Sequence, residues 1–325
     1  MRGDIDINDV HPVYRVVILT LDNHAAGPCA RVAEQLAGDF PGLALEVHAA
    51  AEWGESPAAL ERAKAAIARA DIVVTALLFL DEHVSAILPD LEARRDDCDA
   101  MIGLVSDARI VRLTRMGTLD MSAPESGTRK LLKKLRGGGG SGKGDDAAKK
   151  MRMLRRLPRI LRLIPGRAQD LRAWFLLMQY WLGASDDNIE SMVRFLMSRY
   201  CRYDGWRGGQ APAPHEYPDT GLYHPDMPGR LAEDPAALPA PEAPHATVGL
   251  LMMRSYVLAG DTAHYDTVIR ALEARGLRVL PAFAGGLDGR PAIDAFFRDR
   301  TGARIDALLS LTGFSLVGGP AYNES

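Results

Sequence analysis

Cysteine is scarce in this sequence, and its scarcity excludes two kinds of small site. The 325 residues contain three cysteines, Cys29, Cys98 and Cys201, which lie far apart and form no Cys-x-x-Cys pair. Neither a disulfide framework nor a zinc site is therefore indicated. Dispersed thiols fit a reducing compartment, so we expect the protein in the cytoplasm.

The sequence also lacks a long apolar run. No stretch approaches the ~18 residues that a membrane-spanning helix needs. Residues 1–12 lack the basic region followed by an apolar one that marks a signal peptide. We expect neither secretion nor membrane insertion.

A complete phosphate-binding loop is missing as well. Gly137, Gly142 and Lys143 match most of the pattern G-x-x-x-x-G-K-[ST], but Gly144 stands where the Mg²⁺-binding hydroxyl is needed. The preceding stretch TRKLLKKLR is basic and amphipathic rather than a buried strand, and DDAAKK follows without an apolar period. We therefore interpret residues 129–150 as a basic, Gly-rich flexible linker and expect no bound ATP.

Charge is unevenly distributed in a chain of otherwise ordinary globular composition, which is 47% hydrophobic and 25% charged with a net charge of −3. Residues 129–172 hold fifteen Lys or Arg against three acidic residues. Such a segment could dock on an acidic partner, lipid headgroups or RNA, or it could be a solvated face beside the linker.

The first part of the chain alternates strands and helices. Apolar runs without polar alternation predict strands at 14–22, 43–50, 71–80 and 99–107, and a helical stretch follows each of them, the last at 108–121. Ser56 is the expected N-cap of the second helix, with Pro57 at its first position. This pattern predicts a doubly wound α/β domain with a parallel sheet that is covered on both faces.

Residues 151–201 predict a helical connecting region. RAQDLRAWFLLMQYWLGAS has apolar residues all around the helix cylinder and must be buried on nearly every side. The next helix should be capped by Ser185, with Asp186 and Asp187 at the positive end of its dipole. We assign structure rather than chemistry to this region.

A Pro-rich loop is predicted at 202–246, which carries nine of the twenty prolines. It contains six residues of metal-binding type, but their spacing matches no known ligand pair, so we expect no metal site. These residues are His215, Glu216, Asp219, His224, Asp226 and His245.

A second parallel α/β domain should begin at 247. TVGLLMMRSYV, LRVLPAFAGG and RIDALLSLTGF predict strands, separated by two helices, the first capped by Asp261. Because the sequence stops soon after a strand, we expect this domain to be truncated. The predicted organisation is a head domain at 1–128, the linker at 129–150, the helical region at 151–201, the Pro-rich loop at 202–246 and the second domain at 247–325.

Several blocks of the sequence resemble the large, or H, subunit of magnesium chelatase and, more weakly, the large subunit of cobaltochelatase. The blocks are MLRRLPRILRLIPG with its continuation to residue 200, GLYHP at 221–225, the stretch 250–293 and LTGFSLVGGPAYN at 311–323. VVILTLDNH and AFAGGLDGRPA are closer to the magnesium enzyme. The resemblance covers nearly the whole chain outside the Gly-rich stretch.

The resemblance implies a role in inserting Mg²⁺, as the substrate ion, into protoporphyrin IX for chlorophyll or bacteriochlorophyll. It also implies separate AAA+ ATPase subunits, of the I and D types, that hydrolyse ATP in place of this chain. The family's subunit is several times longer, so the catalytic residues are expected outside this segment and these 325 residues alone should be inactive. We expect no nucleic acid partner, and peripheral membrane contact stays open.

Within this segment, the expected porphyrin-binding candidates lie where strands of the second sheet end, because crevices at the carboxyl ends of strands bind ligands. Arginines would hold the propionates, and a carboxylate or His would take pyrrole protons. The candidates are Arg254, Ser255, His264, Tyr265, Asp288 and Arg290.

Each candidate also has a purely structural interpretation. Arg254 and Arg290 could pair with carboxylates, Asp288 could hold a turn, and His264 could lie on a helix surface. A different class of function is a non-catalytic docking module that uses the basic segment 129–172.

Overall fold

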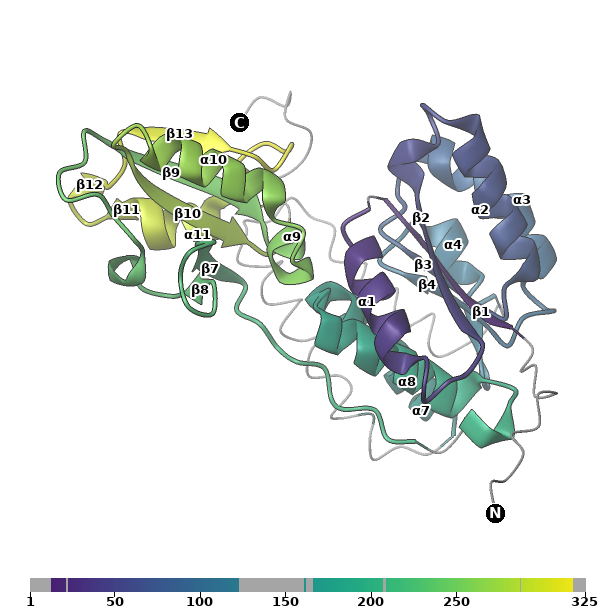
Figure 1. Cartoon of the computed structure of the whole chain (residues 1–325). Coiled ribbons are helices and arrows are strands. Elements are labelled where there is room, and N and C mark those ends of the chain that lie inside the picture. The colour runs from purple at the N-terminus through teal and green to yellow at the C-terminus, as the bar shows by residue number, and fades with distance from the viewer. Residues whose placement is uncertain are drawn as a thin grey trace, which may run out of the picture. The chain divides into compact units, whose positions relative to one another are not determined.

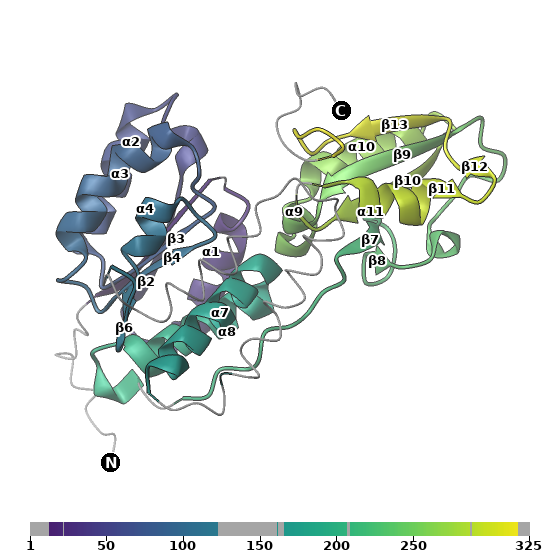
Figure 2. The same cartoon turned by 180° about the vertical axis from the view of Figure 1, so that it is seen from behind.

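A computed structural model describes residues 13–21, 23–122, 161, 166–206, 209–286 and 288–317. Two compact units, Met1–His215 and Glu216–Ser325, are distinguished by their internal contacts, and each is described by itself (Figures 1 and 2). The predicted linker 129–150 lies outside the described residues. The five-part division made from the sequence stays a prediction.

The first unit is built on a mostly parallel sheet with the strand order β2-β1-β3-β4-β5-β6. The four predicted strands are confirmed and pair in parallel, whereas the two short strands that follow are antiparallel. The strands are β1 (Tyr14–Thr20), β2 (Leu43–Ala49), β3 (Ile72–Ala76), β4 (Ala100–Leu104), β5 (Arg115–Met116) and β6 (Leu119–Asp120).

Helices cover both faces of this sheet, as the unbroken apolar strands require. Val17, Leu19 and Val73 face a core shared with α2 (Pro57–Arg69), α3 (Asp81–Arg94) and α4 (Ala108–Arg112), next to the 3₁₀ turn η1 (Ala50–Glu52). Alternate residues such as Val16 and Ile18 face a core with α1 (Ala26–Leu36), α7 (Arg167–Gly183) and α8 (Asp186–Tyr200). The two views in Figures 1 and 2 show these helix layers on opposite sides.

The helix signals in the sequence are largely confirmed. The Ser56 and Ser185 hydroxyls each accept a hydrogen bond from a backbone N–H three residues on, at 3.3 Å. Helix α7 is buried on nearly every side, and the Trp174 indole N–H donates to the Gly103 carbonyl of β4 at 3.0 Å. The first unit therefore includes the helices predicted as a connecting region.

One prediction in this unit is wrong, because the helix expected at 108–121 ends at Arg112 and a β5–β6 hairpin follows. The Thr114 hydroxyl accepts from the Gly103 N–H at 3.0 Å, which pulls the chain back to the sheet. Gly117 then adopts a left-handed φ of +56°, and the adjacent Thr118 N–H donates to Asp170 at 2.8 Å. A turn that glycine favours and a partner about fifty residues away override the helical periodicity.

The second unit contains a mixed sheet with the order β13-β9-β10-β7-β8. Its three parallel strands are β9 (Thr247–Met253), β10 (Arg278–Ala284) and β13 (Ala307–Ser310), while β7 (Thr220–Tyr223) and β8 (Leu231–Ala232) run antiparallel. All three lie within predicted strands, but the first prediction, 247–257, is wrong beyond Met253, because its last four residues are helical. Helices α9 (Arg254–Ala259) and α10 (Ala263–Glu273) cover one face. The short helix α11 (Arg290–Ala292) and the π-helical turn η4 (Ile293–Phe297) cover the other.

The Pro-rich stretch differs from the predicted loop because β7 and β8 lie within it, along with the 3₁₀ turns η2 (Asp204–Trp206) and η3 (Pro235–Ala237). The strands fall between prolines, and a Cβ at Gly221 would lie 2.5 Å from the Phe283 ring, so close packing requires glycine there. Helix α10 begins after Thr262 rather than Asp261, without a side-chain cap. Strands β11 (Arg298–Asp299) and β12 (Gly302–Ala303) form a separate two-stranded ribbon.

Candidate functional site

The carboxyl ends of β9 and β10 meet at one edge of the second sheet. The strands pair in parallel with Met253 opposite Ala284, and four of the six predicted residues follow these two positions in the sequence. Arg254 and Ser255 open α9, while Asp288 and Arg290 come shortly after β10. The structure therefore brings both predicted groups to the same edge.

Arg254 is half-buried and ties this edge to the segment that leads into β7. Its Nε–H donates to the Pro218 carbonyl at 2.8 Å and its Nη2–H donates to the Tyr217 carbonyl at 3.0 Å. These bonds hold the guanidinium against the backbone of the segment before β7.

Asp288 and Arg290 form a two-pronged ion pair. The Nε···Oδ1 and Nη2···Oδ2 distances are 2.9 and 2.7 Å, and the Arg290 backbone N–H also donates to Oδ1 at 3.0 Å. The hydrogen bonds from Arg290 lower the pKa of Asp288 below its usual value despite an opposing effect of burial. Both the pairing and the turn proposed from the sequence are present, and Arg290 is exposed to solvent.

His264 and Tyr265 differ sharply in exposure although they are adjacent in α10. Tyr265 is buried, and its hydroxyl accepts from the Met253 N–H at 3.2 Å, which fixes the end of β9. The exposed His264 ring lies 3.9 Å from the Tyr265 ring and 5.5 Å from that of Tyr256, measured between centroids. Tyr265 therefore supports the edge, while His264 presents an imidazole to solvent.

The GLYHP block contains structural residues that the sequence did not identify as such. His224 is 1% exposed; its Nδ1 accepts from the Asp226 N–H, so Nε2 carries the proton shared with Glu273 at 2.9 Å. The Tyr223 hydroxyl donates to Asp266 at 2.7 Å. These bonds attach β7 to α10. In the sequence, the polar residues that recur at helical spacing along α10 are the one sign of these contacts.

Asp226 completes this contact with an ion pair to Arg270 at 2.7 Å, and the hydrogen bonds from that arginine lower the pKa of Asp226.

Across the described part of the chain, no group of three or more His, Cys, Asp or Glu side chains is arranged to hold a metal ion.

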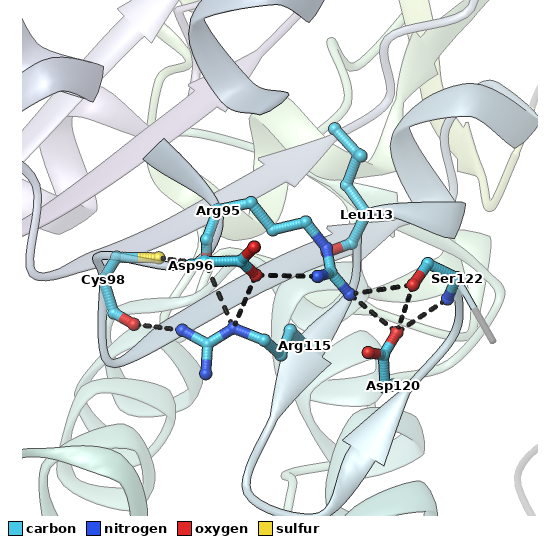
Figure 3. A network of polar contacts seen from close by, with 7 residues as sticks. All are labelled: Arg95, Asp96, Cys98, Leu113, Arg115, Asp120 and Ser122. Carbon is cyan, nitrogen blue, oxygen red and sulfur yellow. Dashed lines mark hydrogen bonds and ion pairs between the residues drawn. The ribbon is translucent and has the colours of Figure 1, made fainter. Parts of the chain in front are cut away.

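A second polar network lies in the first unit, where Arg95 at the end of α3 meets the β5–β6 hairpin (Figure 3). Arg95 donates to the Leu113 carbonyl at 3.0 Å and to Asp120 at 2.6 Å, and Arg115 donates to the Arg95 and Cys98 carbonyls. Burial acts to raise the pKa of Asp120, but hydrogen bonds from Ser122 and the charge of Arg95 outweigh it and lower the pKa. The network holds the hairpin in place and presents no reactive group.

A shallow cavity of about 220 Å³ lies in the first unit rather than at the predicted edge. Its walls include Phe40 and Trp206, whose rings are 5.4 Å apart, and Arg194, which pairs with Asp39 and Glu190 at 2.7 and 2.8 Å. Because both carboxylates already neutralise Arg194, the described lining residues do not offer a free cation to an anionic ligand.

Two family models match the chain in succession. Residues 15–175 match a domain of unknown function (DUF3479), and residues 178–325 match the CobN/Magnesium Chelatase model. The chain is 59% identical over all 325 residues to the H subunit of the magnesium chelatase of Cereibacter sphaeroides. The chain belongs to the CobN/magnesium chelatase family.

Further family members extend the comparison. The magnesium-chelatase H subunit of Rhodobacter capsulatus is 63% identical over 312 residues, or 96% of this chain. The chain spans about a quarter of the length of these curated relatives, 27% and 26% respectively. The catalytic subunit of cobaltochelatase from Mycobacterium tuberculosis aligns with 92% of this chain and 18% of its own, at a TM-score of 0.42 and 15% identity.

Proposed function

We propose that this chain is the N-terminal portion of the porphyrin-binding subunit of an ATP-dependent magnesium chelatase, which inserts Mg²⁺ into protoporphyrin IX in (bacterio)chlorophyll biosynthesis. The observation that carries the proposal is the 59% identity to the large subunit of a magnesium chelatase along the whole chain. A cobaltochelatase-type role is the alternative, because the matching family model covers both enzymes.

The chemistry explains the proposed division of labour. Mg²⁺ gives up its water ligands reluctantly, so its insertion into a porphyrin needs an energy supply. In this proposal separate AAA+ subunits of the I and D types hydrolyse ATP, while the large subunit binds the macrocycle. We place the complex in the cytoplasm; within the described residues, no helix is long and apolar enough to cross a membrane.

A chelation assay tests the proposal directly. The full-length subunit with its ATPase partners, Mg²⁺, ATP and protoporphyrin IX should form the magnesium porphyrin, seen by its fluorescence. The 325 residues in its place should form none, because they span about a quarter of the relatives' length. Chelation of cobalt but not magnesium by the full-length subunit would instead favour the alternative.

We further propose that the edge after β9 and β10 contributes to porphyrin binding through Arg254, Ser255, His264, Tyr265, Asp288 and Arg290. The exposed Arg290 could exchange Asp288 for a propionate, since a guanidinium binds either carboxylate through two parallel hydrogen bonds. His264 offers an accessible imidazole as a proton acceptor.

Replacing the two arginines tests this assignment. An Arg254→Ala, Arg290→Ala variant should bind protoporphyrin at least about tenfold more weakly in a fluorescence titration. Arg298→Ala is the matched control, because Arg298 is also exposed and paired, with Asp294 at 3.6 Å, but lies on the separate ribbon. Since Arg254 also supports backbone carbonyls, the single Arg290→Ala variant is measured in parallel. Unchanged affinity in both variants would reject the propionate role.

A further inference from the structure

Phe79 and Leu80 form an exposed apolar pair in the loop between β3 and α3. Their exposed fractions are 53% and 52%, the two highest among the large hydrophobic residues exposed in the described part of the chain. The loop lies at the carboxyl edge of the first sheet, beside the point where the strand order reverses between β1 and β3. Doubly wound domains present their binding surfaces at this position.

The loop is held firmly rather than left free to cover its apolar residues. The Leu77 N–H donates to the Val105 carbonyl at 3.0 Å, the Leu78 N–H donates to the Ser106 hydroxyl at 3.2 Å, and the Leu78 side chain is fully buried. Leu77 and Val105 have φ values of +61° and +40°, which residues other than glycine adopt only when the surrounding structure constrains them. The fold therefore tolerates backbone strain at Leu77 and Val105, and the loop holds Phe79 and Leu80 at the surface.

Exposed carboxylates lie beside this apolar pair. Asp81 and Glu82 follow it directly, with side chains 82% and 77% exposed. Trp53 packs against α3, with its ring centroid 5.9 Å from that of His83, and the exposed Glu52 and Glu55 are close to Trp53 in the sequence. Arg109 neutralises only part of the charge, because it pairs with both Asp81 and Asp107, at 2.7 and 3.0 Å.

This combination selects a kind of partner. An acidic rim repels phosphate groups, so nucleotides and anionic lipid headgroups do not fit it. A rigid apolar centre with a charged rim is the arrangement of a protein interface. We propose that Phe79, Leu80 and the neighbouring carboxylates dock a partner protein that presents an apolar pocket rimmed by Lys and Arg. The partner is an ATPase subunit of the complex, an identification that rests on the proposed function.

Binding of the purified ATPase subunits to the full-length subunit tests the proposal. The Phe79→Ser, Leu80→Ser variant should bind at least about tenfold more weakly in a biosensor titration, because these side chains would form the buried centre of the interface. Glu82→Lys should also weaken binding, and wild-type affinity should fall as salt rises. Val13→Ser is the matched control, since Val13 is 48% exposed but lies before β1 at the opposite edge of the sheet.

The outcomes separate this inference from the proposed function. Circular dichroism checks that each variant is folded, as expected for substitutions at exposed positions. A folded double variant that binds every ATPase subunit within about twofold of wild type overturns the docking surface. Failure of the wild-type complex to chelate magnesium overturns the proposed function, while the binding titration still decides the docking surface.

Discussion

Asp170 shows how much of the first unit depends on one carboxylate. It is 8% exposed and accepts hydrogen bonds from the Thr118 N–H and hydroxyl, both at 2.8 Å, and from the Tyr200 hydroxyl at 3.0 Å. Burial first, and then this carboxylate, raise the pKa of Tyr200. The sequence shows Asp170 only as an acid in a basic stretch, because its partners are 52 and 30 residues away.

Cys29 leads to a prediction about alkaline pH. Burial first, and then the charge of Asp186, raise the pKa of this thiol from 9.0 to about 12. A raised folded-state pKa contributes stability that is complete below pH 9 and is lost as the pH rises toward 12, because the unfolded thiol ionises first. The urea concentration at the midpoint of unfolding should therefore decrease as the pH rises from 9 to about 12. This decrease should be steeper in wild type than in Cys29→Ala.

Thiol chemistry supplies the independent check for Cys29. All three cysteines are buried and none is in a disulfide, so the native protein should not react with a thiol reagent at about pH 8.5, whereas urea-unfolded protein should react at three sites. Rapid reaction of Cys29 in the folded protein, or identical pH slopes for the two proteins, would contradict the raised pKa.

At the scale of elements, apolar periodicity predicts the buried strands well and the peripheral ones poorly. All five residues of β3 and of β4 are buried, so their sequences carry no polar alternation and can hardly be misread. Strands β5 to β8 have two to four residues each, too few to establish a period. They are held by partners from other parts of the chain, which are Arg95, Asp170 and Glu273.

The β5–β6 turn gives a prediction for one element. In Gly117→Ala, the new methyl carbon would lie 2.7 Å from the Asp170 carboxylate, at a φ of +56°. Strain and steric conflict should lower the free energy of unfolding by roughly 2–3 kcal/mol in urea denaturation. Gly54→Ala is the control, since its added carbon meets nothing within 4 Å and should change stability little. Equal stability of the two variants would show that the hairpin can shift away from Asp170.

At the scale of the whole molecule, the family match and the two α/β units follow from the sequence, but the grouping of elements does not. Helices α7 and α8, predicted as a connecting region, form part of the first unit's core. The predicted porphyrin candidates do share one sheet edge, because parallel strands bring their carboxyl ends together. The contacts of Arg254 with Tyr217 and Pro218 depend on backbone paths that no local pattern encodes, whereas the pair of Arg290 and Asp288 is local.

Separate expression of the two units tests this grouping. The His215 N–H bonds to Asn188 of the first unit, whereas Arg254 of the second unit holds the carbonyls of Tyr217 and Pro218. Because each unit has its own cores, fragments 1–215 and 216–325 should each unfold cooperatively on heating, followed by circular dichroism. A non-cooperative melt for either fragment would show that the boundary cuts through a folding unit.

Strand β13 has a practical consequence for handling the chain. In the described sheet it pairs with β9 on one side only, and all four of its residues are exposed, with Leu308 and Leu309 at 37% and 38%. Unpaired backbone donors and acceptors beside exposed apolar side chains can pair with strands of other molecules, which is the first step toward aggregation. Concentrated solutions of these 325 residues should become turbid, and the Leu309→Lys variant should stay free of turbidity.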